Sequence, residues 1–99
     1  MEKICAKIRW LSAKEGGRKE RLPDGCRYFP TIILKCDPTQ THWSTEFVVA
    51  PISADGISRI KFSLLIDNPE TRVVENQLTK GTEFVFCEGA RIVAVGIVI

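Results

Sequence analysis

Several features that would assign the chain to a large protein class are missing. The longest uncharged apolar run, residues 92–99, is far shorter than the about 20 residues that a membrane-spanning helix needs. Residues 1–4 (MEKI) do not begin an apolar stretch followed by small residues, so we expect no signal peptide. There is no Cys-x-x-Cys pair, and His42 is the one histidine, which argues against a zinc site. We therefore expect a cytoplasmic protein without a membrane partner or a bound metal.

The chain also has little net charge. The chain has 14 Lys and Arg against 12 Asp and Glu, for a formal net charge of +2. This is too little to attract nucleic acid to the whole domain, so any contact with phosphate must come from a local group of cations. The Gly-x-x-x-x-Gly-Lys-Ser/Thr loop that cradles nucleotide phosphates is absent from the sequence. We expect neither a nucleotide nor any other cofactor.

The four cysteines, Cys5, Cys26, Cys36 and Cys87, are expected to be free thiols, because cytoplasmic proteins keep their thiols reduced. Cys5 is a candidate for exposure because it shares its side of a strand with charged residues, and Cys87 because it precedes a Glu-Gly turn. A Cys–His nucleophile would need His42 beside Cys26 or Cys36, and nothing around these residues resembles an activated nucleophile. We therefore expect no enzyme activity.

The overall composition, with 44% hydrophobic and 26% charged residues, is typical of one small globular domain covering residues 1–99. Apolar and polar residues alternate most clearly in residues 4–10 and 58–66, which is typical of half-buried strands. Other strands are predicted for residues 28–35, 47–49, 71–75, 82–87 and 91–99. No segment has the apolar spacing of a long helix, so an all-β fold is predicted.

A closed six-stranded antiparallel β-barrel is the architecture that these short, closely spaced strands favour. Closure pairs the strongly apolar last strand, residues 91–99, on both sides, so that no edge of it stays exposed. Gly96 within that strand predicts a tight bend or a close approach of another group to the backbone.

Two segments carry more specific information than the composition does. Residues 11–18 (LSAKEGGR) follow the first predicted strand, and residues 80–98 (KGTEFVFCEGARIVAVGIV) form the closing hairpin. Together and in this order they resemble the third, C-terminal β-barrel domain of bacterial elongation factor Tu. The resemblance covers about residues 3–98 and includes an Arg-aromatic strand at residues 27–31.

The resemblance implies a barrel that binds macromolecules without catalysis. In the family this domain packs on its sister domains, helps to hold the T stem of aminoacyl-tRNA and is contacted by the exchange factor. The family arginine that contacts tRNA corresponds to Arg18, with Lys19 next to it, and the hairpin glycine that approaches tRNA corresponds to Gly89. A family glutamine at the tRNA surface corresponds to Phe29, and a family hairpin arginine to Cys87, so only part of the phosphate-facing set is present.

A protein partner is expected first: a component of the translation apparatus, a toxin or effector that recognises the factor, or a second copy of this chain. An immunity or decoy protein belongs to the same class. A solitary barrel must make the surface that its sister domains cover polar, or give it a partner. Trp43, in a predicted loop beside His42, and Phe29 are the candidate anchors, whereas Trp10 shares the apolar side of its strand and is predicted to lie in the core.

An RNA-binding module is the alternative. It would use the cations of the glycine-containing loop together with the closing hairpin: Lys14, Arg18, Lys19, Arg21, Gly89 and Arg91. Glu15 and Glu20 offset two of the loop charges, so we interpret this loop first as a solvated turn. The sequence therefore ranks binding of a protein above binding of tRNA or other RNA.

Overall fold

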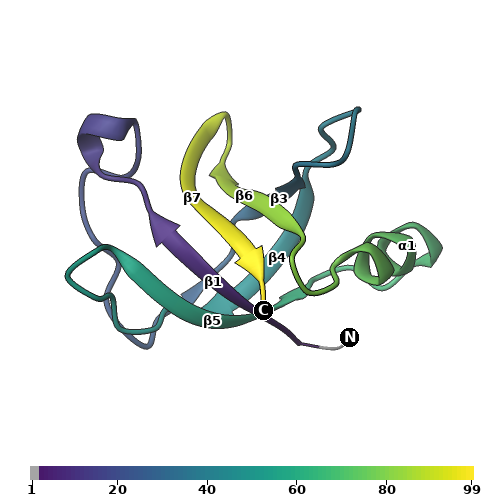
Figure 1. Ribbon diagram of the computed structural model, residues 1–99, viewed down its shortest axis with the longest axis horizontal. Coiled ribbons are helices and arrows are strands. Elements are labelled where there is room, and N and C mark those ends of the chain that lie inside the picture. Colours follow the sequence, from purple (N-terminus) through teal and green to yellow (C-terminus); the bar gives the residue numbers. More distant parts are fainter. Residues whose placement is uncertain (1–2) are drawn as a thin grey trace.

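Strands are the main regular elements of the chain, and they form one antiparallel sheet that closes on itself (Figure 1). The computed structural model describes residues 3–99. Residues 1–2 belong to the N-terminal segment in which we expect no signal peptide, and they lie outside the described part. The elements in chain order are β1 (Ile4–Trp10), the 3-10 helix η1 (Ala13–Glu15), β2 (Arg27–Tyr28), β3 (Thr31–Leu34), β4 (Trp43–Val48), β5 (Ile57–Leu64), α1 (Pro69–Gln77), β6 (Glu83–Glu88) and β7 (Arg91–Val98).

The pairing order closes the barrel. β1 pairs with β5 on one side and with β7 on the other, and β7 continues through β6 and β3 to β4. β4 then pairs with β5, with Thr45 opposite Leu64 and Phe47 opposite Phe62. The short strand β2 is added to β4 next to this ring. The predicted closed six-stranded antiparallel barrel is confirmed.

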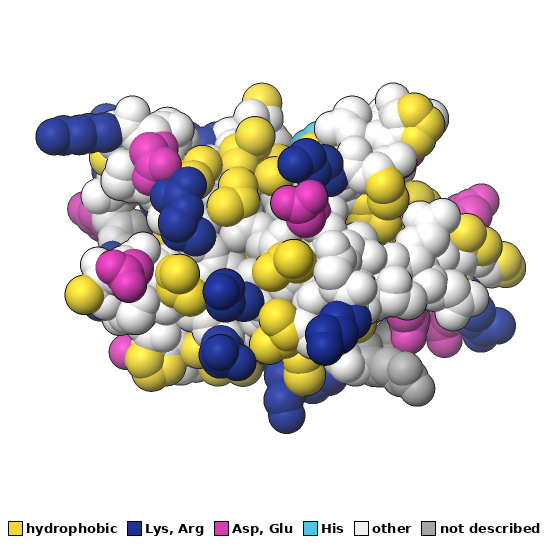
Figure 2. Space-filling view, viewed as in Figure 1, with side chains coloured by type: hydrophobic (Ala, Val, Ile, Leu, Met, Phe, Trp, Pro, Cys, Tyr) yellow, Lys and Arg dark blue, Asp and Glu magenta, His cyan; other side chains and the backbone are white. Residues whose placement is uncertain are grey.

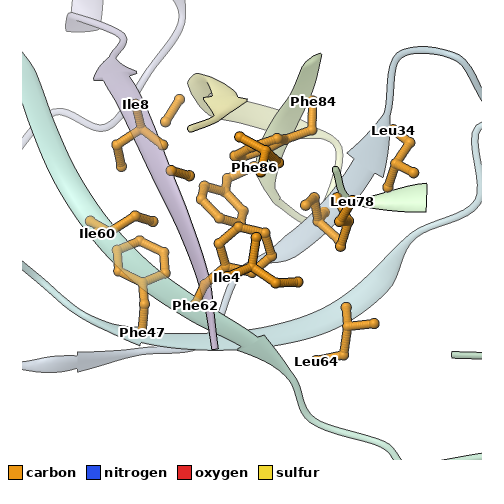
Figure 3. Close-up of a cluster of buried hydrophobic side chains, with 14 of the residues drawn as sticks. Ile4, Ile8, Leu34, Phe47, Ile60, Phe62, Leu64, Leu78, Phe84 and Phe86 are labelled. Carbon is orange, nitrogen blue, oxygen red and sulfur yellow. The ribbon is translucent and has the colours of Figure 1, made fainter. Parts of the chain in front are cut away.

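Alternation along the strands directs one side of each toward a core inside the barrel (Figure 3). In β1, Ile4 and Ile8 are buried, as the period of two in this segment predicts. At the centre, the ring centroids of Phe84 and Phe86 lie 5.0 Å apart, and Phe62 lies 5.4 Å from Phe84. Burial of each such ring contributes about 2–3 kcal/mol, so this cluster is a main source of stability.

Gly96 makes room for one of these rings. It lies in β7 opposite Phe84 of β6 and Ile8 of β1. A Cβ at this position would overlap the ring of Phe84 and would lie 2.9 Å from Cγ2 of Ile8. The predicted close approach to the backbone of Gly96 is therefore confirmed, and the approaching group is an aromatic side chain.

The strand predicted for residues 71–75 is wrong, because this segment lies in α1. Asn68 caps the helix: its side chain accepts the N–H of Thr71 at 2.9 Å, and the Thr71 hydroxyl accepts the N–H of Asn68 at 2.9 Å. Pro69 suits the first helical turn, where its missing N–H costs no hydrogen bond. Thr71 and Val74, three residues apart, are the buried positions of this short helix. Local capping outweighs the strand propensity of its β-branched residues.

Two other strands differ from their predicted bounds by more than two residues. Pro30 interrupts the strand predicted for residues 28–35, because it has no N–H for the ladder, and β2 and β3 result. The carbonyl of Pro30 accepts hydrogen bonds from the amide and the hydroxyl of Thr45, at 3.0 and 2.7 Å. The strand predicted at residues 47–49 begins earlier, at Trp43, which therefore does not lie in a loop.

The cysteines are free, as predicted, and Cys5 is exposed. Cys87 is buried, which corrects the expectation that the turn after it exposes its side chain. The strand pairing shifts register between Phe86 and Cys87, and both of these successive residues are buried. Burial raises the pKa of the Cys87 thiol, so this group is less reactive than an exposed cysteine.

Replacement of Gly96 tests the packing of the Phe84 ring. We expect Gly96→Ala to lower the free energy of unfolding by about 2 kcal/mol, because the added methyl overlaps a ring that the core holds in place. Urea unfolding of Gly96→Ala, Phe84→Leu and the double variant measures this. The double variant must lose less than the sum of the single losses, and additive losses would contradict the proposed contact.

Candidate binding surface

Aromatic side chains close one end of the barrel. The ring centroids of Trp10 and Tyr28 lie 5.9 Å apart, and those of Tyr28 and Phe47 lie 5.5 Å apart in an edge-to-face arrangement. The indole N–H of Trp10 donates to the hydroxyl of Ser58 at 3.3 Å. Trp10 is half-buried and packs against the core, which agrees with its predicted place on the apolar side of β1.

Arg18 connects the first loop to the closing hairpin at this end. Its guanidinium forms an ion pair with Glu88, and the same carboxylate accepts the hydroxyl of Tyr28. The Nε–H of Arg18 donates to the carbonyl of Glu20 at 3.2 Å, and the guanidinium lies 6.0 Å from the centre of the Tyr28 ring. The candidate phosphate ligand is therefore already paired with a carboxylate of its own chain.

These three groups fix one another's protonation. Partial burial raises the pKa of Glu88, but the hydrogen bonds from Tyr28 and Arg18 outweigh it, so the pKa lies below its ordinary value. Burial, followed by the hydrogen bond to Glu88, raises the pKa of Tyr28. The hydrogen bond to Glu88 also raises the pKa of Arg18. At neutral pH the cluster consists of a carboxylate, a neutral phenol and a guanidinium, and has no group with a pKa near 7 for proton transfer.

The two glycines before Arg18 explain how it reaches the hairpin. Gly16 ends η1 with φ at +91°, a conformation that favours glycine. The N–H of Gly17 donates to the carbonyl of Ser12 at 2.9 Å, and a Cβ at Gly17 would lie 2.7 Å from the carbonyl carbon of Leu11. The chain thus folds back tightly on the end of β1 before Arg18. In this chain the Glu-Gly-Gly-Arg segment has a structural role that is independent of any ligand.

Other candidate residues of the loop and the hairpin are exposed. Arg21 forms a surface ion pair with Asp24 at 3.0 Å, whereas Lys19 has no carboxylate partner among residues 3–99. In the hairpin, Gly89 has φ at +59° and lies beside the paired Glu88. Arg91 is exposed and contributes to lowering the pKa of Glu88. These positions remain predicted contacts. The charged groups of Lys19 and Arg91 are exposed, so a partner can reach them.

The two candidate aromatic anchors lie in different environments. Phe29 is 55% exposed, and the Arg27 guanidinium, which pairs with Glu46, lies 5.4 Å from the centre of its ring. Trp43 is half-buried against the core instead, and it lines a hollow of about 320 Å³ between α1 and residues 37–41. Phe29 is therefore the more exposed of the two anchors.

The sequence reasoning missed an apolar groove of about 590 Å³ on the outside of the barrel. Across this face Ile33 lies opposite Val85, and Val85 lies opposite Val95. We define the outer groove by the aliphatic side chains that line it: Ile33, Ile57, Val85, Ile92, Val95 and Ile97. The signal for this groove in the sequence is β7 (RIVAVGIV). After Arg91 this strand has none of the polar residues that normally alternate with core residues on a solvated strand.

A group of cations borders the outer groove. Ile97 of β7 lies opposite Lys7 of β1, and Lys7 lies opposite Arg59 of β5. Lys61, on the same side of β5, lies opposite Cys5. We define Lys7, Arg59 and Lys61 as the basic strip; all three are exposed and have no carboxylate partner among residues 3–99. Figure 2 shows hydrophobic and cationic side chains intermixed on the visible face of the barrel.

Replacement of Gly17 tests the fold of the Glu-Gly-Gly-Arg segment. We expect Gly17→Ala to lower the free energy of unfolding by about 2 kcal/mol, because its methyl group would overlap the backbone of Leu11. Gly16→Asn is the matched control, since asparagine tolerates the left-handed conformation and this position is open. Urea unfolding must show a smaller loss for the control, and equal losses would contradict the proposed role of Gly17.

The Glu88 contact predicts a pH-dependent stability. The pKa of Glu88 is lower in the folded chain than its ordinary value of 4.5, so its contribution is fully present above pH 4.5 and is lost as the pH falls through the folded value. We expect Glu88→Gln to lower the free energy of unfolding at pH 7 more than at pH 3. Urea unfolding at both pH values measures the difference, with Glu20→Gln as the control. A loss that is the same at both pH values would show that the carboxylate charge is irrelevant.

Comparison with known proteins identifies no family: no protein-family model matches the chain, and no curated protein sequence matches it significantly. Residues 3–99 contain no cluster of three or more His, Cys, Asp and Glu side chains placed to hold a metal ion. No helix in the same residues has the length and hydrophobicity to span a bilayer. The functional inference therefore depends on the surface features of the barrel.

Proposed function

We propose that the chain is a non-catalytic, cytoplasmic protein-binding module related to the third barrel domain of elongation factor Tu. The observation that carries this proposal is the outer groove, an apolar hollow of about 590 Å³ on a face that a solitary barrel exposes to water. Concave apolar surfaces of this size are typical of binding sites. The closed six-stranded barrel supports the relationship to the elongation factor domain at the level of architecture.

The side chains of the outer groove favour a protein over RNA. Proteins that bind single-stranded RNA stack its bases on aromatic rings, and the one aromatic residue of the groove lining, Phe84, is buried. The phosphate ligands predicted in the first loop are also partly occupied, because Arg18 pairs with Glu88 and Arg21 with Asp24. A phosphate would have to displace these carboxylates before it could bind. Protein binding through apolar contacts requires no such exchange.

Affinity capture from a nuclease-treated bacterial lysate tests the proposal. We expect immobilised wild-type chain to retain protein at high salt, because apolar contacts resist screening. The double variant Val95→Asn/Ile97→Asn should lose this protein. The matched control Val48→Asn/Leu65→Asn changes two exposed aliphatic residues outside the groove and should retain it. Circular dichroism establishes that all three chains fold.

The same affinity capture without nuclease tests the alternative, an RNA-binding module. Capture of RNA that is released by added salt and by Lys19→Ala/Arg91→Ala, but not by the groove variant, would overturn the proposal in favour of the RNA-binding module.

A further inference from the structure

The basic strip is unfavourable for the folded chain by itself. Lys7 and Arg59 lie directly opposite each other in the β1–β5 pair, where like charges destabilise a sheet. Lys61 adds a third cation on the same side of β5, and none of the three has a carboxylate partner among residues 3–99. The neighbouring Arg9, in contrast, is paired with Glu15 at 3.0 Å. Local conflicts of this kind are expected at functional sites, where a ligand supplies the missing group.

The strip and the outer groove form one surface. Ile97, Lys7 and Arg59 follow one another across β7, β1 and β5, and Lys7 itself lines the groove. The one carboxylate in the groove lining, Glu83, lies 3.6 Å from the Lys35 ammonium, so it leaves the positive charge of the strip uncompensated. A ligand in the groove therefore meets aliphatic side chains and, toward β1 and β5, cations that have no carboxylate partner among residues 3–99.

We propose that the outer groove and the basic strip together bind an acidic, apolar peptide segment of another protein. Its aliphatic or aromatic side chains fill the groove, and its Asp or Glu carboxylates pair with Lys7, Arg59 and Lys61. This assignment rests on the proposed protein-binding function and adds the chemistry of the partner. It also assigns a role to the cations of the basic strip, for which the described residues provide no carboxylate.

A second copy of the chain fits this surface poorly. A two-fold dimer buries the same patch of both chains, so both basic strips would enter one interface without carboxylates of their own, among residues 3–99, to pair with. Like charges in contact cost several kcal/mol of binding free energy. A membrane also fits poorly, because all the aliphatic groove residues except Ile92 are half-buried and line a hollow. An acidic segment has complementary charge and shape.

Selection from a phage-displayed library of random dodecapeptides against the immobilised full chain tests this assignment. We expect the selected peptides to combine Asp or Glu with Leu, Ile, Val or Phe. Fluorescence anisotropy then measures the Kd of a labelled synthetic copy. Lys7→Glu/Arg59→Glu should weaken binding by roughly 10- to 100-fold, and a peptide with its acidic residues changed to lysine should bind this variant more tightly than it binds the wild type. Lys14→Glu/Lys80→Glu, with the same change in net charge, should alter the Kd less than about twofold.

A stability measurement separates recognition from a structural role. Lys7→Gln removes the repulsion with Arg59, so we expect its Tm to rise by roughly 1–5 °C while its affinity for the peptide falls. A lower Tm together with weaker binding would mean that Lys7 supports the fold, and would overturn its assignment to the partner.

The outcomes distinguish this proposal from the protein-binding function. Peptides that lose affinity for Val95→Asn/Ile97→Asn but are not acidic, and that bind Lys7→Glu/Arg59→Glu normally, would overturn the acidic assignment and leave protein binding intact. Failure to select any peptide that depends on Val95 and Ile97 would overturn both. Tighter binding of a single-stranded RNA oligonucleotide to the basic strip, weakened by Lys7→Glu/Arg59→Glu, would make the strip an RNA surface instead.

Discussion

The two-sided pairing of β1 is the constraint on which the rest of the structure depends. This strand pairs with β5 and with β7, and so joins the middle of the chain to its last strand. The register of both pairings directs Ile4 and Ile8 into the core and Lys7 outward, in line with Ile97 and Arg59. A shift of one residue would reverse these directions. The core, the outer groove and the basic strip are therefore consequences of the same register.

The contact between Arg18 and Glu88 shows how a familiar segment can have a structural role. Gly16 and Gly17 let the loop fold back on β1, and the ion pair then connects it to the closing hairpin above the aromatic end of the barrel. A partly exposed ion pair of this kind contributes modestly to stability, on the order of 1 kcal/mol or less. Its larger consequence is to occupy the arginine that the family resemblance assigns to tRNA.

Barrel closure also limits the way in which a partner can bind. Each of the six strands of the ring pairs with a neighbour on both sides, so none of them is an edge strand to which another chain could add a full strand. A partner must therefore contact outward-facing side chains. The outer face provides two contrasting kinds: aliphatic residues on β3, β6 and β7, and cations on β1 and β5 that have no carboxylate partner among the described residues. Such a divided surface favours a partner that is itself both apolar and charged, and it gives the interaction a defined orientation.

The sequence by itself determined the strand-rich fold and the buried face of β1, and it marked Gly96 as the place of a tight bend or a close approach, because alternation and glycine placement are local signals. It did not reveal the helix at residues 71–75, where the cap formed by Asn68 outweighs the β-branched residues that follow. Only the tertiary structure decided that Arg18 meets Glu88, and that Lys7 meets Arg59 beside an apolar groove. Each of these pairs joins segments far apart in the chain, and their meeting depends on strand order and register, which no local pattern of residues specifies.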